Sequence, residues 1–182
     1  MKNACIFHGT SGSPDHFWHP YVKRELEEIG YGVWVPQLPD TDNPNLEKQL
    51  PFVLENHNYN EGTVLIGHSA GCPLILSLLQ NINTEIKLAI LVAGFCEQLS
   101  DDPDYILQKE YDWNRISSNC KNFVFINSVN DPWGCNDKQG RKMFDQLGGE
   151  LIIRNEGHMG SESFNQPYKE FPLLVNLVKS FE

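Results

Sequence analysis

Residues 63–71 read TVLIGHSAG, and this stretch decides the fold. A run of apolar residues, 63–66, ends at Gly67, passes through small residues, and leads into a helix-like segment that includes residues 74–79. The run is apolar throughout instead of alternating, which is typical of a strand covered on both faces. The stretch therefore predicts a buried parallel strand, a tight turn and a helix that packs back on the sheet.

The same alternation of strand-like and helix-like segments extends outward along the chain. Further helix-like segments span 21–29, 46–55, 138–147 and 171–181, with Pro51 expected to kink or split the second of these. Residues 105–113 read as a possible short helix within an insertion spanning 97–120. The pattern predicts an α/β fold, a parallel sheet with helices on both faces. The strand-like runs are 4–7, 31–35, 63–66, 88–93, 123–126 and 151–153.

Composition narrows the class of protein. With 182 residues, 40% of them hydrophobic, the chain suits one domain spanning residues 1–182. The 24 acidic residues exceed the 14 basic ones, so a nucleic-acid partner is not expected. The longest apolar run, 88–96, is far shorter than a membrane helix needs. Five cysteines without a Cys-x-x-Cys pair or an apolar leader predict a reduced, cytoplasmic protein with no metal site.

Ser69 occupies the centre of a Gly-x-Ser-x-Gly turn between the predicted strand and helix. Such a turn strains the serine backbone and lifts its hydroxyl above the sheet edge, at a helix N-terminus that favours negative charge. This context predicts a nucleophile. The alternative is a glycine-rich turn with an incidental serine.

A serine nucleophile needs a base and an acid, which in this fold follow it in the order acid, then histidine. His158 is the one histidine after Ser69, and it follows the last predicted strand. Asp131 follows the fifth strand, so its side chain is expected at the same edge. The rival acids are Glu97, Asp101 and Asp102, read as loop charges, and Asp137, read as a helix N-cap.

The loop at 8–14 is glycine-rich and follows the first predicted strand. We expect its Thr10 and the residue after the nucleophile, Ala70, to supply the backbone N–H groups of an oxyanion hole. A phosphate-binding loop is disfavoured because no lysine follows the glycines. Ser11, Trp18 and Trp133 are candidate pocket residues, with a core position as the alternative for Trp18. No cofactor is expected.

These motifs resemble the α/β-hydrolase superfamily, and within it the small serine hydrolases similar to retinoblastoma-binding protein nine and its bacterial relatives. The resemblance implies a catalytic triad of Ser69, Asp131 and His158. It also implies a three-layer α-β-α sandwich of about six strands, without a large lid, that cleaves small esters or amides. Its motifs are Gly9-Thr10-Ser11-Gly12 with Trp18, Gly67-His68-Ser69-Ala70-Gly71, Trp113 with Asn119-Cys120, Asn130-Asp131-Pro132 and Gly157-His158.

One family feature is missing. The Leu-x-Cys-x-Glu motif for binding the retinoblastoma pocket is replaced at 55–61 by ENHNYNE, so that partner is not expected. The predicted function is therefore hydrolysis of small acyl substrates, with an acyltransferase or a non-catalytic binding module as alternatives. The insertion at 97–120 carries many charges, which favours short acyl groups. The sequence makes no prediction of oligomeric state.

Overall fold

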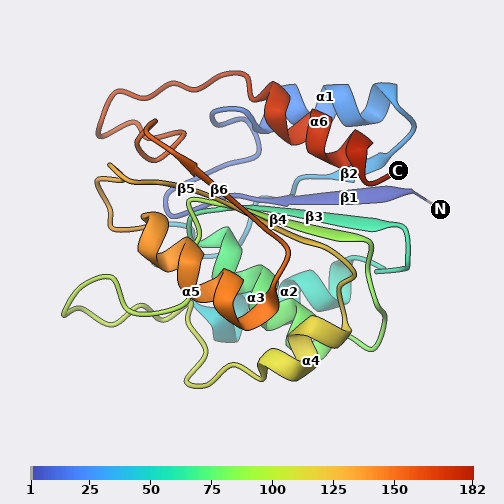
Figure 1. The fold of residues 1–182 in the computed structure, drawn as a ribbon, viewed down its shortest axis with the longest axis horizontal. Coiled ribbons are helices and arrows are strands. Elements are labelled where there is room, and N and C mark those ends of the chain that lie inside the picture. Colours follow the sequence, from blue (N-terminus) through green and yellow to red (C-terminus); the bar gives the residue numbers. More distant parts are fainter. Residues whose placement is uncertain (1) are drawn as a thin grey trace.

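Six parallel strands form one sheet in the computed structural model, which describes residues 2–182 (Figure 1). The strand order is β2-β1-β3-β4-β5-β6. The chain therefore begins one strand in from an edge, adds the edge strand β2, and then builds β3 to β6 in order on the other side of β1. All six expected strands are present. Their bounds are β1 Asn3–Phe7, β2 Gly32–Trp34, β3 Thr63–His68, β4 Leu88–Val92, β5 Phe123–Ser128 and β6 Glu150–Arg154.

The helices cover both faces of this sheet (Figure 1). Helices α1 and α6 lie on one face, and the other four lie on the opposite face, where α3 packs between α2 and α4. The predicted three-layer α/β architecture is confirmed. The helices are α1 His19–Glu28, α2 Leu46–Asn56, α3 Gly71–Asn81, α4 Trp113–Ser118, α5 Asp137–Leu147 and α6 Pro172–Ser180.

Three local predictions need correction or refinement. The possible helix at 105–113 is wrong: the helix begins at Trp113, where the Asp112 carboxylate accepts a hydrogen bond from the Arg115 N–H. The cap of α5 is Asn136, whose side chain accepts from the Lys138 N–H, and Asp137 is already helical. Pro51 lies inside α2 without splitting it.

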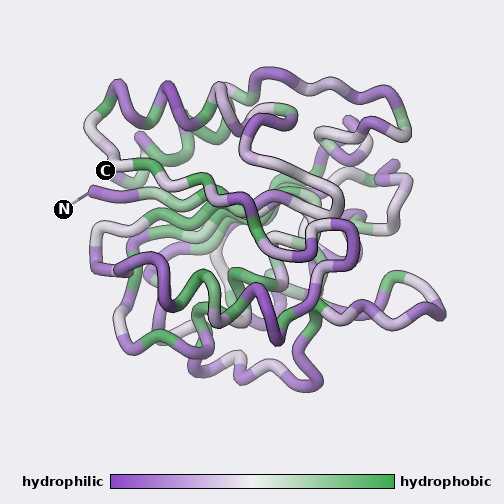
Figure 2. Tube along the Cα trace, turned by 180° about the vertical axis from the view of Figure 1, so that it is seen from behind, coloured by the Kyte–Doolittle hydropathy of each residue, from purple (hydrophilic) through white to green (hydrophobic). Residues whose placement is uncertain are grey.

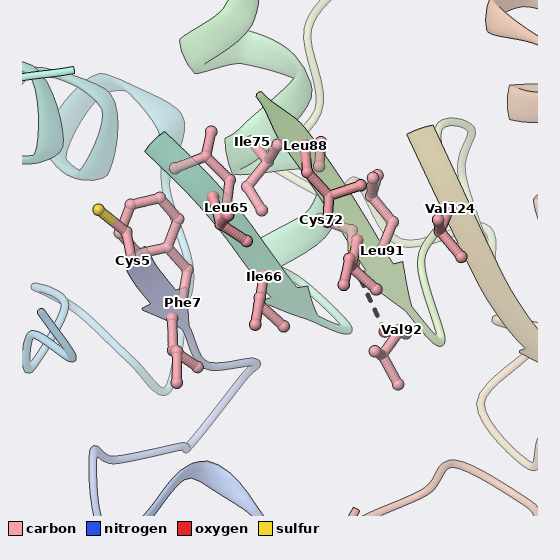
Figure 3. Close-up of a cluster of buried hydrophobic side chains, with 14 of the residues drawn as sticks. Cys5, Phe7, Leu65, Ile66, Cys72, Ile75, Leu88, Leu91, Val92 and Val124 are labelled. Carbon is pink, nitrogen blue, oxygen red and sulfur yellow. Dashed lines mark hydrogen bonds between the residues drawn. The ribbon is translucent and has the colours of Figure 1, made fainter. Parts of the chain in front are cut away.

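The middle of the sheet is buried on both faces, which explains the continuous apolar runs. Every residue of β3, β4 and β5 is buried, and so are residues 71–79 of α3. The hydrophobic residues gather along the strands in Figure 2, with hydrophilic segments around them. In Figure 3, Leu65 and Ile66 of β3 lie beside Leu91 of β4, and the Cys72 thiol donates to the Val92 carbonyl at 3.4 Å. Within residues 2–182, no helix has the length and apolar character that crossing a bilayer requires.

Candidate active site

The turn after β3 holds Ser69 in a strained conformation. Its φ is +53°, in the left-handed region that favours glycine. Ser69 is partly exposed between two buried neighbours, and its N–H donates to the Val92 carbonyl at 2.9 Å. Gly71 permits the turn, because a Cβ at Gly71 would lie 2.2 Å from the Phe7 carbonyl oxygen. The elbow is thus pressed against the end of β1 with the serine directed out of the core.

The loop after β1 reaches the same serine. A Cβ at Gly9 would lie 2.8 Å from Ser69 Cβ and 3.3 Å from Ser69 Oγ, so only glycine permits this approach. The Ser11 N–H is already used, because it donates to the Thr41 carbonyl at 2.7 Å. Among residues 2–182, no backbone carbonyl accepts a hydrogen bond from the N–H of Thr10 or of Ala70. Both expected oxyanion donors are therefore available to a ligand.

Asp131 and His158 form a buried pair, although 27 residues separate them. His158 Nδ1 and Asp131 Oδ2 are 2.7 Å apart, and the Asp131 side chain is 0% exposed. The other carboxylate oxygen, Oδ1, accepts from the N–H groups of Trp133 and Cys135 at 2.9 and 3.3 Å. These bonds fix the carboxylate, so that it can orient the imidazole and stabilise its protonated form.

The rival acids lie elsewhere. Asp101 and Asp102 are exposed residues of the loop that follows β4, and Asp137 begins α5. Glu97 forms an exposed ion pair with Lys142 of α5. None of these carboxylates is paired with His158 in the described part of the chain. The geometry therefore favours Asp131 over all four alternatives.

The loop that carries His158, residues 157–159, is held by its backbone N–H groups. The Gly157 N–H donates to Asn130 Oδ1 and the His158 N–H donates to Gln166 Oε1, both at 2.9 Å. Gly157 has a φ of +59°, and a Cβ there would collide with the Gln166 side chain. One anchor thus comes from the turn that carries Asp131, and the other from the chain beyond the loop.

Two carbonyl groups of the same loop accept hydrogen bonds from buried side chains. His68 Nε2 lies 2.9 Å from the His158 carbonyl, so this nitrogen carries the ring hydrogen. Trp18 Nε1 donates to the Met159 carbonyl at 3.0 Å. Burial lowers the pKa of His68 well below its usual range, which keeps the ring neutral. Two consecutive carbonyls are therefore fixed by buried donors.

Trp18 is not a pocket residue. The structure buries it completely, with its indole packed edge-on against His19 and His68, so the expectation that it lines the pocket is corrected. Trp133 is 50% exposed and meets Phe164 edge-on at 5.2 Å between ring centroids. Ser11 is exposed as well, so both Ser11 and Trp133 can contact a ligand from solvent.

Sequence reasoning missed one neighbour of this pair, Cys135. Its thiol is buried, and the charge of Asp131 lies close to it. One donor atom each from Asp131, Cys135 and His158 lies within 4.8 Å of the others, an arrangement that could hold a metal ion. A search for cysteine pairs could not find this group, because its three members come from two different loops. Gln166 was missed as well, and the sequence carried no signal for it.

Comparison with known proteins identifies a family and relatives for this chain. The family model described as "Serine hydrolase" matches residues 4–178. YdeN of Bacillus subtilis (strain 168) is 32% identical over 135 residues, covering 71% of this chain and 71% of YdeN. The rat protein named serine hydrolase RBBP9 is 26% identical, covering 97% of this chain and 94% of RBBP9.

Solved structures show the same fold. The crystal structure of the Bacillus subtilis ydeN product has a TM-score of 0.89 and 26% identity, covering 100% of this chain and 98% of that one. Est1E from Butyrivibrio proteoclasticus, solved with ferulic acid bound, has a TM-score of 0.71 and 16% identity, covering 100% and 88%. At that identity Est1E is informative about the fold alone.

Proposed function

The chain belongs to the serine hydrolase family, and on that basis we propose that it hydrolyses small carboxylic esters through an acyl-enzyme on Ser69. The observation that carries the proposal is the buried pair of Asp131 and His158, 2.7 Å apart, at the sheet edge where Ser69 lies. Amides and thioesters are the alternative substrates. The proposed setting is the cytoplasm, because all five cysteines are free and buried.

The proposed reaction has two halves. Ser69 Oγ attacks the acyl carbonyl while His158 Nε2 takes the hydroxyl proton and then gives it to the leaving alcohol. Asp131 holds Nδ1 and stabilises the imidazolium. The N–H groups of Thr10 and Ala70 bind the oxyanion. Water then attacks the acyl-enzyme, His158 takes its proton, and the acid and free Ser69 are regenerated.

The proposed substrate is small because the exposed large apolar side chains near the site are few, namely Val129, Trp133 and Phe164. The segment from 97 to 112 carries charged side chains, and Asp101 and Asp102 are exposed on it. A long acyl chain needs a sizeable apolar groove or lid to exclude water. The exposed aromatic pair of Trp133 and Phe164 offers a limited surface, sufficient for a short acyl or leaving group.

The proposal is tested with a panel of nitrophenyl esters and a fluorophosphonate probe, using Ser69→Ala as the control. We expect ester cleavage and covalent labelling of the parent protein, and neither in the variant. Product analysis with an added alcohol separates hydrolysis from acyl transfer, since a transferase would yield mainly the new ester. A parent protein that is neither labelled nor active on any ester, amide or thioester would instead be a binding module.

A further inference from the structure

Three chemically different donors converge beside Ser69. The Asp131 carboxylate, the Cys135 thiol and the His158 imidazole each place a donor atom within 4.8 Å of the other two, and all three are buried. The cluster combines sulfur, nitrogen and oxygen, the donor set used by zinc. The proposed hydrolysis uses two of these groups, whereas the thiol has no part in it.

The cluster needs little movement to receive an ion. Tetrahedral zinc binds its donors at about 2.0–2.3 Å, which places the donors roughly 3.3–3.8 Å from one another. The described donors lie within 4.8 Å, and the Asp131–His158 contact of 2.7 Å would have to open slightly. The backbone around the thiol is already fixed, because Asn127 Nδ2 donates to the Cys135 carbonyl at 2.9 Å and the Cys135 N–H donates to Asp131.

We propose that Asp131, Cys135 and His158 form a binding site for a thiophilic divalent cation of the zinc class, and that occupancy of this site stops the hydrolase. The inhibitory part rests on the proposed function, whereas cation binding does not. A thiol favours zinc or cadmium over magnesium or calcium, which prefer oxygen donors. A water completes four-fold coordination.

Cation binding to Cys135 and His158 would block the base of the proposed hydrolysis. As the metal–sulfur bond forms, the Cys135 thiol releases its proton to solvent and the cation takes the place of that proton. A cation on His158 Nδ1 leaves the ring hydrogen on Nε2, and a cation on Nε2 occupies that nitrogen directly. In either case His158 has no lone pair with which to take the Ser69 proton.

Cation binding is measured directly, without reference to catalysis. The protein is freed of metal with a chelator, the chelator is removed, and Cd²⁺ is added while the ultraviolet thiolate-to-cadmium absorption is followed. Cys135→Ala removes the donor, and Cys135→Ser repeats the test with a near-isosteric side chain. Cys120→Ala is the matched control, since Cys120 is also a free, buried thiol but lies outside the cluster, bridged to Ile86 before β5. Near-ultraviolet circular dichroism confirms that each variant folds.

We expect one Cd²⁺ per chain in the parent and in Cys120→Ala. Both Cys135 variants should lose the absorption band and weaken zinc inhibition of ester hydrolysis by at least about tenfold. Zinc should protect Ser69 from the fluorophosphonate in the parent and in Cys120→Ala, but in neither Cys135 variant. No band in the parent, a band that survives in the Cys135 variants, or unchanged zinc inhibition in them would each overturn the site. A band with no fluorophosphonate labelling under any condition would leave the site standing and remove the proposed hydrolysis.

Discussion

Two segments border the carboxyl edge of the sheet, and they are held in opposite ways. The His158 loop, residues 157–159, is anchored by Asn130, Gln166, His68 and Trp18, four side chains from outside the loop. The 97–112 segment follows β4 and projects from the body as a loop (Figure 1).

Side-chain hydrogen bonds within the 97–112 segment are mainly internal. The Leu99 N–H donates to Asp104, and the Asp104 N–H donates to Gln98. Residues 101–103 are exposed and Tyr105 is 66% exposed, whereas Ile106 beside it is buried. The comparison shows that hydrogen bonds from the rest of the fold hold the His158 loop, whereas few such bonds hold the 97–112 segment. Substitutions in the fixed part should therefore alter the rate, and those in the 97–112 segment should alter the choice of substrate.

The largest effect is expected at the centre of the fixed part. Ser69→Ala should lower kcat/KM for nitrophenyl acetate by about 10⁴-fold or more, because no covalent path remains. Ser117→Ala, an exposed serine of α4, is the matched control and should stay within twofold of the parent. Steady-state kinetics with circular dichroism measure both. Activity of Ser69→Ala within twofold of the parent would remove the nucleophile assignment.

Asp131→Asn should lower kcat by up to about 10⁴-fold while the fold is kept, because the amide favours the wrong tautomer of His158. The same change at Asp101 and at Asp102, on the variable segment, should cost less than twofold. Single-turnover kinetics on the three variants provide the comparison. If Asp131→Asn were nearly silent and an Asp101 or Asp102 variant were inactive, the 97–112 segment would be the source of the acid and the comparison would be reversed.

Acid should lower the free energy of unfolding, because the fold buries three histidines in their neutral form. Burial lowers the pKa of His19 to about 4, and His8 and His68 shift in the same direction. The unfolded chain therefore binds these protons first. The stabilising contribution of these histidines should be fully present above about pH 6.5 and should fall as the pH drops toward 4, by about 1.4 kcal/mol per pH unit for His19. His8 and His68 should add to this loss in the same direction.

Urea unfolding at pH 7, 6 and 5 measures this slope. In His19→Asn the free energy of unfolding should depend less steeply on pH. The difference in bound protons between the unfolded and folded states should fall by up to one, since one of the titrating groups is gone. An equal free energy of unfolding at pH 7 and pH 5 in the parent would show that the buried histidines do not govern acid stability.

The anchors of the His158 loop should act on rate and not on binding. Trp18→Phe removes the N–H that bonds the Met159 carbonyl and keeps an apolar ring, so we expect kcat to fall by about tenfold with KM nearly unchanged. A displaced loop should also shift the pH profile of kcat/KM. His57→Phe is the control, because His57 stacks on Trp34. Equal losses in the two variants, with unaltered pH profiles, would reduce Trp18 to a general packing role.

The sequence predicted the sheet and the order of the reacting residues for the same physical reason. Buried parallel strands are continuously apolar, and their carboxyl ends meet at one edge, so residues following β3, β5 and β6 had to converge. The anchors could not be predicted, because they depend on loop conformations with positive φ at Phe17 and Met159. The helix proposed at 105–113 does not form although Ile106 and Tyr111 pack against the core. A segment this short is marginal as a helix, and the Tyr105 carbonyl accepts from the Leu46 N–H of α2.

The smallest effect is expected on the variable side, in the choice of acyl chain. Tyr105, Asp101 and Asp102 lie on the exposed 97–112 segment, and such a surface cannot exclude water from a long acyl chain. Acetyl and butyryl esters should therefore exceed octanoyl and palmitoyl esters of the same leaving group in kcat/KM, without a jump in rate above the micellar concentration. Replacing Tyr105 by Ala should change the ratio of butyryl to acetyl activity by a few-fold and leave the acetyl rate nearly unchanged, whereas Trp133→Ala tests the opposite rim. A steady rise in kcat/KM toward palmitoyl would mean that the 97–112 segment folds over the site as an apolar lid, and the contrast between the two segments would no longer describe the enzyme.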